Sequence, residues 1–452
     1  MQFIHARRAL LPHGWNTDVR VSITDGKIMS IEIGVAAQVS DESVHTAIPG
    51  MPNLHSHAFQ RGMAGLAERR GPSTDSFWTW RELMYQCALT MTPDQLEAVA
   101  VRLYVEMLEA GFTRVGEFHY LHHDRDGQHY DNIGEMAIRI AAAASRTGIG
   151  LTLLPVFYAH STFGGEPPGI EQRRFVSDLD GFARLLEASR TAVASLDTAV
   201  VGVAPHSLRA VTPDELAAVC AMEPEEPIHI HVAEQQREID DSIAWSGMRP
   251  VEWLLNHAEV DDRWCLIHAT HMTGSEVQRL AASGAIAGLC PITEANLGDG
   301  TFAGQDFVQH GGRYGVGSDS NILIGIADEL RQLEYSQRLA HRARNVMANS
   351  GGSTGRAMFD AAVRGGSVAL GVNETGLAKG AQADIVTLTG ELIDLLDGDG
   401  ALDAWIFTNG VAVDDVWVGG TKVVEAGRHR LRENVSTGFQ RAMRELLAGE
   451  ER

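Results

Sequence analysis

Short apolar runs alternate with amphipathic segments through the middle of the chain. Each run is five to seven residues long, which suits a buried strand. The runs cover residues 48–54, 113–118, 151–157, 199–204, 227–232, 264–268, 285–290 and 313–318. Eight such repeats of a strand and a helix predict an α/β protein whose parallel strands close into a (β/α)8 barrel, the TIM-barrel architecture.

Helix-start signals open several of the amphipathic segments. At Thr92 a capping hydroxyl precedes a proline and, three residues on, a glutamine, and the helix that follows should end at Gly111. Thr212 and Thr273 begin similar segments, each with a glutamate three residues later. An open doubly wound sheet stays the alternative to a barrel, although it would more often carry a glycine-rich phosphate loop, which the sequence lacks.

The two ends of the chain follow a different pattern from the middle. Residues 1–47 form short β-type runs with a hairpin-type turn at residues 25–27, and residues 376–430 contain similar runs separated by glycine pairs. Both ends together therefore predict a small β-sandwich domain. The barrel would occupy residues 48–375, and a C-terminal helix would follow over residues 431–452.

The chain is acidic and nearly free of lysine. Its 452 residues include 37 basic and 59 acidic side chains, which give a formal net charge of -22. Because such a surface repels polyanions, the composition argues against nucleic acid and anionic membranes as partners. The chain has no apolar run of membrane-spanning length and no signal-peptide pattern, and its four isolated cysteines suit buried free thiols, so we expect a soluble cytoplasmic protein.

Metal-binding residue types fall at the carboxyl ends of four predicted strands. His55 and His57 follow the first run, His231 ends the fifth, His268 ends the sixth, and Asp319 follows the eighth. The active sites of (β/α)8 barrels lie at this end of the strands. Alternate residues of an extended segment point the same way, so the first two imidazoles can bind one ion. Three imidazoles and one carboxylate suit zinc or a similar divalent ion.

Any one of these histidines, taken alone, is as well explained as an ordinary core or surface residue, and only their joint placement favours a site. His229 lies two residues before His231, deeper in the predicted barrel, and we assign it a structural role. We interpret His122 and His123 as loop residues. The roles of Glu294 and Asn321, which lie near the predicted site in sequence, stay open.

Several strings of the sequence resemble the amidohydrolase superfamily. They are GMPNLHSHAFQRGMAGLAE, HIHVAEQQ, CLIHATH, TEANLGDG, GVGSDS and GLAKGAQADIVTL. The resemblance runs in the expected order over nearly the whole chain. Within the superfamily, HAFQRGMAGLAE and SFWTWRELMY are similar to the deiminases of histidine degradation. These hydrolyse N-formimino-L-glutamate to N-formyl-L-glutamate and ammonia.

The resemblance implies one zinc ion with four ligands: His55, His57, His231 and Asp319. It further implies that Asp319 accepts a proton from the metal-bound water, which attacks the formimino carbon as hydroxide. Glu234 would carry the proton to the leaving nitrogen, and His268 would hydrogen-bond the hydroxide or the tetrahedral centre. The chemistry is reasonable, because zinc can lower the pKa of a bound water to about 7 and the nitrogen leaves only when protonated.

The lysine distribution bears on the number of metal ions. Two-metal amidohydrolases commonly bridge their ions with a carbamylated lysine at the end of the fourth strand. This chain has Ala204-Pro205-His206-Ser207 there and no lysine from residue 28 to residue 378. That bridge cannot form, and neither can a Schiff base within the barrel. A one-metal site is favoured, while a bridging glutamate stays open.

The implied substrate carries two carboxylates, so an acidic protein must place cations where they bind. Arginine suits this role because its guanidinium can bind a carboxylate through two parallel hydrogen bonds. Arg81, in the long connection after the first strand, and Arg209, just past the fourth, are the candidates, although an arginine in an aromatic-rich segment is as often a packing or ion-pair residue. Four further residues complete the expected substrate pocket: Gln60, Tyr120, His206 and Ser320.

Two other functions stay open from the sequence. One is a different one-metal deaminase of the superfamily, acting on a purine, a pterin or another amidine. The other is a non-catalytic scaffold, which would typically have lost metal ligands that are all present here. We also expect a homodimer, because similar enzymes are commonly dimers.

Overall fold

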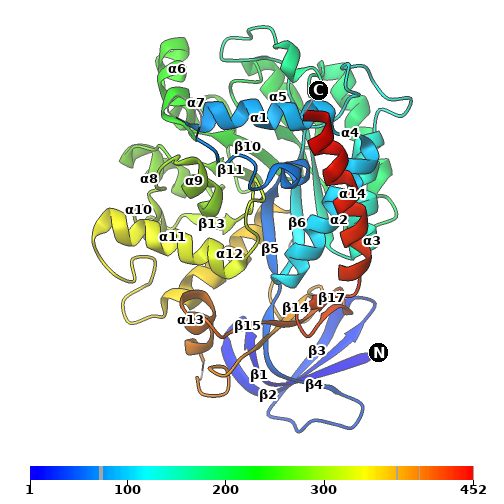
Figure 1. The fold of residues 1–452 in the computed structure, drawn as a ribbon. Coiled ribbons are helices and arrows are strands. Elements are labelled where there is room, and N and C mark those ends of the chain that lie inside the picture. Colours follow the sequence, from blue (N-terminus) through cyan, green and yellow to red (C-terminus); the bar gives the residue numbers. More distant parts are fainter. Residues whose placement is uncertain (71–74, 373–374, 397, 451–452) are drawn as a thin grey trace.

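The fold is that of a computed structural model, which describes residues 1–70, 75–372, 375–396 and 398–450. Parallel strands fill the middle of the molecule, and a second sheet forms one end (Figure 1). Four short parts of the predicted domains lie outside the described residues. They are residues 71–74 and 373–374 of the barrel range, residue 397 of the β domain and residues 451–452 of the C-terminal helix.

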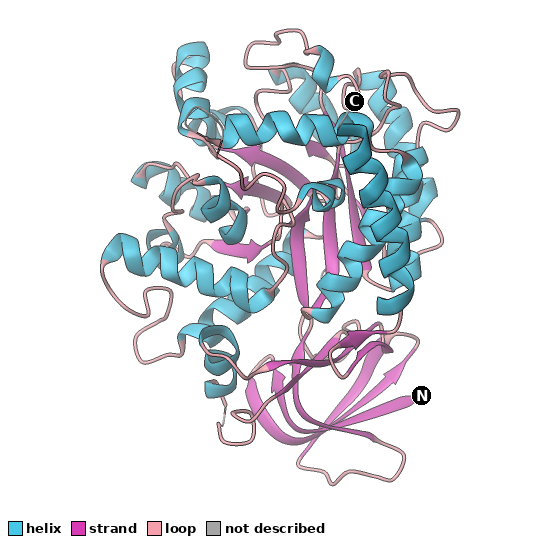
Figure 2. Ribbon diagram, in the orientation of Figure 1, coloured by secondary structure: helices cyan, strands magenta, loops and turns pink. Residues whose placement is uncertain are grey.

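Two sets of parallel strands occupy the centre (Figure 2). One pairs in the order β5-β6-β7-β8, with β9 also on β7, and the other in the order β10-β11-β12-β13. Every predicted run contains strand residues, and the fourth is divided into two short strands. The strands are β5 (Met51–Ser56), β6 (Phe112–His119), β7 (Gly150–Phe157), β8 (Val200–Val201), β9 (Ala204–Pro205), β10 (Ile228–Val232), β11 (Trp264–His268), β12 (Ile286–Leu289) and β13 (Arg313–Val316).

Isolated parallel bridges connect the two sets at both of their edges. Ser56, at the end of β5, is bridged to Asp319, which lies beyond β13. At the other edge, Val203 is bridged to Ile228 of β10, and a bridge from residue 207 reaches His231 of the same strand. These bridges bring the strand ends that carry the predicted metal ligands next to one another.

Helices follow the strands and surround them (Figure 2). The caps at Thr92, Thr212 and Thr273 are confirmed, because each hydroxyl accepts a hydrogen bond from the peptide N–H three residues on. The helices are α1 (Phe77–Thr90), α2 (Pro93–Glu109), α3 (Glu135–Thr147), α4 (Leu179–Val193), α5 (Pro213–Met222), α6 (Gln236–Ser246), α7 (Pro250–His257), α8 (Gly274–Ser283), α9 (Pro291–Leu297), α10 (Gly304–Gln309), α11 (Ile326–His341), α12 (Thr354–Ala369), α13 (Gly400–Phe407) and α14 (Arg432–Glu450), with 3-10 turns η1 (Ala58–Met63) and η2 (Ile170–Gln172).

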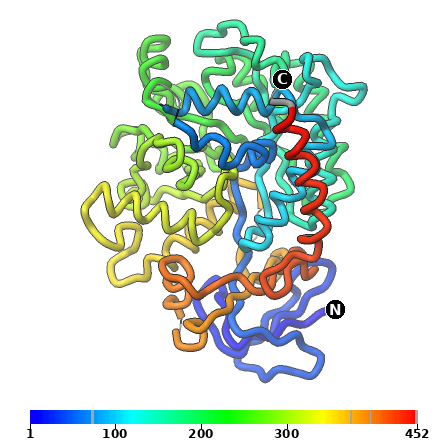
Figure 3. The backbone as a smooth tube through the Cα atoms, in the orientation of Figure 1, coloured from blue at the N-terminus to red at the C-terminus, as the bar shows by residue number. Residues whose placement is uncertain are grey.

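Both ends of the chain meet in one eight-stranded sheet, visible as the blue and orange segments of Figure 3. Its order is β17-β16-β15-β14-β4-β1-β2-β3, and the pairing of β14 with β4 joins the two ends. The predicted turn is confirmed as a two-residue hairpin loop, since Asp25 and Gly26 have φ of 50° and 77°. The strands are β1 (Gln2–Leu11), β2 (Gly14–Thr24), β3 (Lys27–Ile33), β4 (Glu42–Pro49), β14 (Ile385–Thr389), β15 (Ala412–Val418), β16 (Thr421–Glu425) and β17 (Arg428–His429).

The C-terminal helix α14 packs along α2, and so ties the end of the chain to the helices around the parallel strands (Figure 1). A large apolar core fills the space between those strands and their helices, and a separate core containing Trp417 lies in the end sheet. Among the described residues, no helix combines the length and the apolar character needed to cross a membrane.

Helix α12 approaches β13 so closely that a side chain would not fit between them. A Cβ atom placed on Gly365 would lie 1.9 Å from the carbonyl oxygen of Tyr314, whereas one on Gly438 of α14 would meet nothing within 4 Å. The two glycines form a matched pair of helical positions.

We expect Gly365→Ala to destabilise the fold by about 1–3 kcal/mol through forced backbone displacement. Gly438→Ala should instead leave stability unchanged or raise it by about 0.5–1 kcal/mol, because alanine favours the helix. Thermal unfolding of both variants beside the unmodified chain tests this. Equal melting temperatures for the two variants would show that the close approach is unimportant.

Candidate metal centre and active site

Four ligand-type side chains converge where β5, β10 and β13 end. One nitrogen or oxygen atom from each of His55, His57, His231 and Asp319 lies within 4.8 Å of the other three. The Nε2 atom of His55 is 3.2 Å from that of His57 and 3.1 Å from that of His231. Asp319 Oδ1 lies 3.2 Å from His57 Nε2 and 3.4 Å from His55 Nε2. All four residues are buried.

Hydrogen bonds on the outer ring nitrogens fix the form of these imidazoles. His57 Nδ1 lies 2.9 Å from the carbonyl oxygen of Phe118, and His231 Nδ1 lies 3.0 Å from that of His206. Because a carbonyl oxygen only accepts, each Nδ1 carries a proton, and Nε2 is the nitrogen of each ring that faces inward and can bind a metal ion. Burial lowers the pKa of His55 to about 3, which favours the neutral form of this ring. Inward lone pairs beside a carboxylate fit a divalent cation.

The turns that carry these groups have an uncommon backbone conformation. The backbone φ angles are 55° at Ala233, 68° at His268 and 45° at Asp319. For a residue other than glycine, this conformation costs about 1–3 kcal/mol. The Asp319 turn is held by β5, since its N–H donates to the carbonyl of His55 at 2.9 Å and its carbonyl accepts from the N–H of His57 at 3.1 Å. Strand pairing thus maintains the strained position of the carboxylate.

A buried polar network supports the same turn. The Asn53 side chain accepts from the N–H of Ser318 at 3.0 Å and donates to its hydroxyl at 2.7 Å. That hydroxyl donates to Asn321 Oδ1 at 2.6 Å, and Asn321 Nδ2 donates to the carbonyl of His57 at 3.0 Å. Asn321, whose role the sequence left open, therefore links the turn after β13 to the segment that carries the first two histidines.

Glu234 follows β10 and is held by a second carboxylate that the sequence did not single out. Glu238, in the first turn of α6, accepts from the N–H groups of Ala233 at 2.9 Å and Glu234 at 3.3 Å. Burial raises the pKa of the Glu234 carboxyl above its ordinary value, against the opposing effect of His268 and Arg209. A buried carboxylate with a raised pKa is suited to accept and return a proton near neutrality.

His268 lies between three carboxylates. Its Nε2 is 3.6 Å from Glu234 Oε1 and 3.9 Å from Asp319 Oδ2, while its Nδ1 is 3.4 Å from Glu294 Oε1. Burial alone would lower its pKa, but these carboxylates outweigh burial and raise it to about 10. Glu294, also left open by the sequence, is itself fixed by the N–H of Cys290 at 3.0 Å and orients the imidazole.

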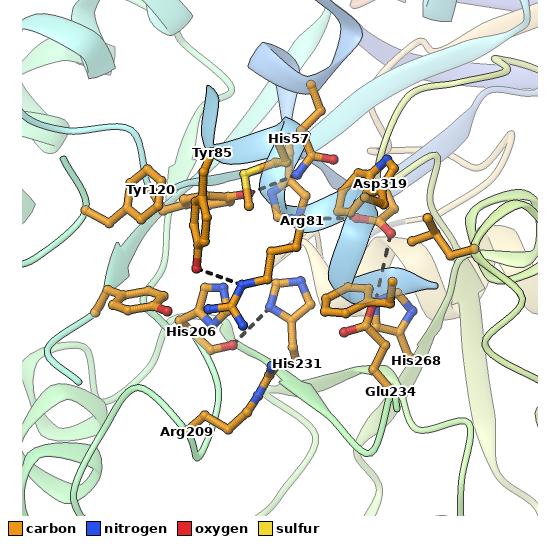
Figure 4. A pocket seen from close by; sticks show the side chains of 17 residues that line it. His57, Arg81, Tyr85, Tyr120, His206, Arg209, His231, Glu234, His268 and Asp319 are labelled. Atoms are coloured by element: carbon orange, nitrogen blue, oxygen red, sulfur yellow. Dashed lines mark hydrogen bonds and ion pairs between the residues drawn. The ribbon is translucent and has the colours of Figure 1, made fainter. Parts of the chain in front are cut away.

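A cavity opens onto these groups (Figure 4). Five of the six predicted substrate-binding residues line it: Gln60, Arg81, Tyr120, His206 and Arg209. Ser320 is not among the lining residues, and its buried hydroxyl lies 2.9 Å from that of Thr293. The structure therefore brings five of these residues together and leaves Ser320 outside the cavity lining, in contact with Thr293.

Two arginines face the cavity with free hydrogen-bonding capacity (Figure 4). Arg81 lies on helix α1, and its Nε donates to the Tyr85 hydroxyl at 2.7 Å. Among the described residues, no carboxylate lies at ion-pair distance from its guanidinium group. Arg209 lies only at the limit of ion pairing with Glu238, at 4.0 Å, and its buried Nε has no hydrogen-bond partner among the described residues. Both guanidinium groups can therefore bind an anionic ligand.

Aromatic residues that the sequence reasoning missed line the same cavity, among them Tyr85, Tyr158 and Phe175. Tyr158 directly follows β7, so the rule applied to the other strand ends would have found it. Tyr85 stands four residues after Arg81 and shares a face of α1 with it, which is visible only once that segment is recognised as a helix.

Three histidines outside the ligand set lie at hydrogen-bond distance from main-chain carbonyl oxygens. His229 Nε2 lies 2.7 Å from the carbonyl oxygen of Ala369, which fits the structural role assigned to it. His122 and His123 lie in the loop after β6, as interpreted, but both are buried, and their Nε2 atoms lie 2.9 Å from main-chain carbonyl oxygens.

Family models match nearly the whole chain. Residues 46–423 match the amidohydrolase family, and residues 1–45 match the N-terminal domain of formimidoylglutamate deiminase HutF. The boundary between the two matches lies within β4, the strand that leads from the end sheet into the parallel strands.

Individual relatives cover the chain from end to end. A formimidoylglutamate deiminase of Pseudomonas aeruginosa is 48% identical over 99% of this chain and 100% of its own length. The crystal structure of an amidohydrolase from Brucella melitensis has 64% identity and a TM-score of 0.98, covering 99% of this chain and 100% of that one. An adenosine deaminase from Xanthomonas campestris with bound zinc shares the fold, with a TM-score of 0.81 at 19% identity, over 99% and 98% of the two chains. The chain therefore belongs to the amidohydrolase family, among its formimidoylglutamate deiminases.

Proposed function

We propose that the protein hydrolyses the formimino group of N-formimino-L-glutamate, a step of histidine degradation, to give N-formyl-L-glutamate and ammonia. One observation carries this proposal. The cavity joins the convergent group of Glu234, His268 and Asp319 to two arginines without close carboxylate partners, Arg81 and Arg209. The identity of 48% with a deiminase of this name supports it.

The resident metal is proposed to be one zinc ion held by His55, His57, His231 and Asp319. When bound, such an ion lowers the pKa of a water molecule to about 7 and so supplies a nucleophile near neutrality. The absence of lysine from residue 28 to residue 378 leaves no carbamylated lysine to hold a second ion. The inward-facing Nε2 atoms of the three imidazoles support the ligand assignment.

Three side chains divide the proton chemistry. Asp319 accepts the proton that the attacking water loses. Glu234, with its raised pKa, carries this proton from Asp319 to the formimino nitrogen, which can then leave as ammonia. His268, held in the charged form by its carboxylate neighbours, donates a hydrogen bond to the oxygen that gains negative charge at the tetrahedral centre.

The other cavity residues are proposed to bind the two carboxylates and the main part of the substrate. Arg81 and Arg209 supply the charges, and three polar side chains complete the contacts: Gln60, Tyr120 and His206. The Tyr120 hydroxyl already accepts from Gln60 Nε2 at 2.9 Å, so these two act as a unit. For Ser320 we propose an indirect role, through its bond to Thr293 and the turn after Asp319.

We also propose that the two sets of parallel strands close into a (β/α)8 barrel over residues 48–375, since bridges join them at both edges. The two chain ends, residues 1–47 and 376–430, meet in the eight-stranded sheet, which we propose folds around its own apolar core as a small β-sandwich domain, followed by the C-terminal helix. The homodimer and the cytoplasmic location stay predictions.

The substrate assignment predicts a sharp preference in an assay of ammonia release. The zinc-loaded protein should release ammonia from N-formimino-L-glutamate and should be at least about 100-fold less active on guanine and adenosine, because their flat rings leave two cavity arginines unpaired. N-carbamoyl-L-glutamate serves as a control with the same carboxylates and a less reactive carbon. Faster turnover of a purine would instead favour a different deaminase.

The proton-transfer role of Glu234 predicts that Glu234→Gln loses activity and keeps the metal. The amide cannot carry a proton, so kcat should fall by about 100- to 10,000-fold. Glu259→Gln is the matched control, because that side chain is exposed in a loop. Steady-state kinetics and metal analysis of both variants test the role. Near-normal turnover by Glu234→Gln would assign the proton transfer to another group.

A further inference from the structure

A buried glutamate of β6 lies against the peptide that follows the first pair of metal ligands. Glu117 is only 1% exposed, and its Oε1 accepts from the N–H of Ala58 at 2.6 Å. Ala58 directly follows His57 and begins the 3-10 turn η1, so its N–H has no acceptor within that turn. The Glu117 side chain supplies the missing acceptor at the point where the chain leaves the metal centre.

Two hydroxyl groups hold the same carboxylate in place. Glu117 Oε2 accepts from the hydroxyl of Tyr104, a fully buried residue of α2, at 3.1 Å. The Ser56 hydroxyl also hydrogen-bonds this carboxylate, and it accepts from Asn321 Nδ2 at 3.2 Å. Among the described residues, no basic side chain lies at ion-pair distance from Glu117. Hydrogen bonds from three neighbours, and not a charge partner, therefore set its position.

Strand β6 contacts the His57 segment through two adjacent residues. The register of β5 on β6 shifts between Asn53 and Ser56, and Ser56 pairs with Glu117. The next residue of β6, Phe118, offers its carbonyl oxygen to His57 Nδ1 at 2.9 Å. The Phe118 carbonyl thus orients the imidazole ring, while the Glu117 side chain fixes the peptide that follows it. Ring and main chain of this ligand are held by the same strand.

We propose that Glu117 is a positioning residue that sets the affinity of the centre for its metal ion. His57 Nε2 must stay close to the other donor atoms, at 3.2 Å from His55 Nε2 and 3.2 Å from Asp319 Oδ1. A shift of the main chain at Ala58 turns the His57 ring away from that point. Groups that orient metal ligands typically contribute a factor of about 10 to 100 in metal affinity. The inference rests on the proposed metal site, but not on the identity of the substrate.

Two substitutions at this one position separate positioning from packing and from charge. Glu117→Gln keeps the shape and an acceptor oxygen for the Ala58 N–H, and the Tyr104 oxygen can accept from its NH₂ group. Glu117→Met has a similar length but leaves the Ala58 N–H and the Tyr104 hydroxyl without a strong acceptor. We expect the zinc dissociation constant, measured by competition with a chelator, to rise about 10- to 100-fold in Glu117→Met. In Glu117→Gln it should stay within about threefold of the value for the unmodified chain, because the acceptor is retained.

Removal of one hydroxyl provides a second, independent test. Tyr104→Phe keeps the ring and deletes one of the hydrogen bonds that hold the carboxylate, so the zinc dissociation constant should rise about 3- to 10-fold. Tyr314→Phe, at a buried tyrosine near the amino end of β13, is the matched control and should leave zinc affinity unchanged. Should Glu117→Met fail to fold, this pair decides the question.

Unchanged zinc affinity in both Glu117→Met and Tyr104→Phe would overturn the inference. So would equal losses in Glu117→Gln and Glu117→Met, because they would assign the effect to the negative charge of the side chain instead of the position of Ala58. Failure of the proposed metal site looks different, since the unmodified chain would then bind no zinc tightly, and the inference would fall with it. An error in the proposed substrate alone would change none of these affinities.

Discussion

The rest of the site depends on one constraint. Three imidazole nitrogens and one carboxylate oxygen must converge on the same point. This convergence exists because the turn after β13 pairs with the end of β5, so that Asp319 meets His55 and His57, while bridges at the other edge bring in His231. Four buried groups of this kind are unfavourable without a cation to share their electrons. The strained turn at Asp319 and the Asn321 network make sense as the means of holding that arrangement.

Charge is organised locally, against the overall acidity of the chain. A net charge of -22 disfavours an anionic substrate at long range, yet the cavity contains two arginines that lack close carboxylate partners. The carboxylates are grouped instead around His268, where they raise its pKa, and burial raises that of Glu234. In the proposed function, the groups around His268 handle protons and the two arginines bind the carboxylates, and both line the same cavity.

The sequence predicted the strands, the helix caps and the residues at strand ends, because these follow from local periodicity and from one rule about parallel strands. It placed Arg81 in a connection, but could not identify the helix face that this residue shares with Tyr85. It also missed Glu238, whose role depends on hydrogen bonds from main-chain N–H groups that folding brings near. Ser320 follows a metal-type aspartate, yet the positive φ turn directs it to Thr293 instead of the cavity.

The central claim is that one ion is held at the meeting point of β5, β10 and β13. Counting zinc per chain by elemental mass spectrometry, after metal removal and reloading, tests it most directly. We expect one tightly bound ion in the unmodified chain and in Glu234→Gln, and loss of that ion in His55→Ala and Asp319→Ala. Two tightly bound ions per chain, or one ion retained when both of those ligands are removed, would contradict it.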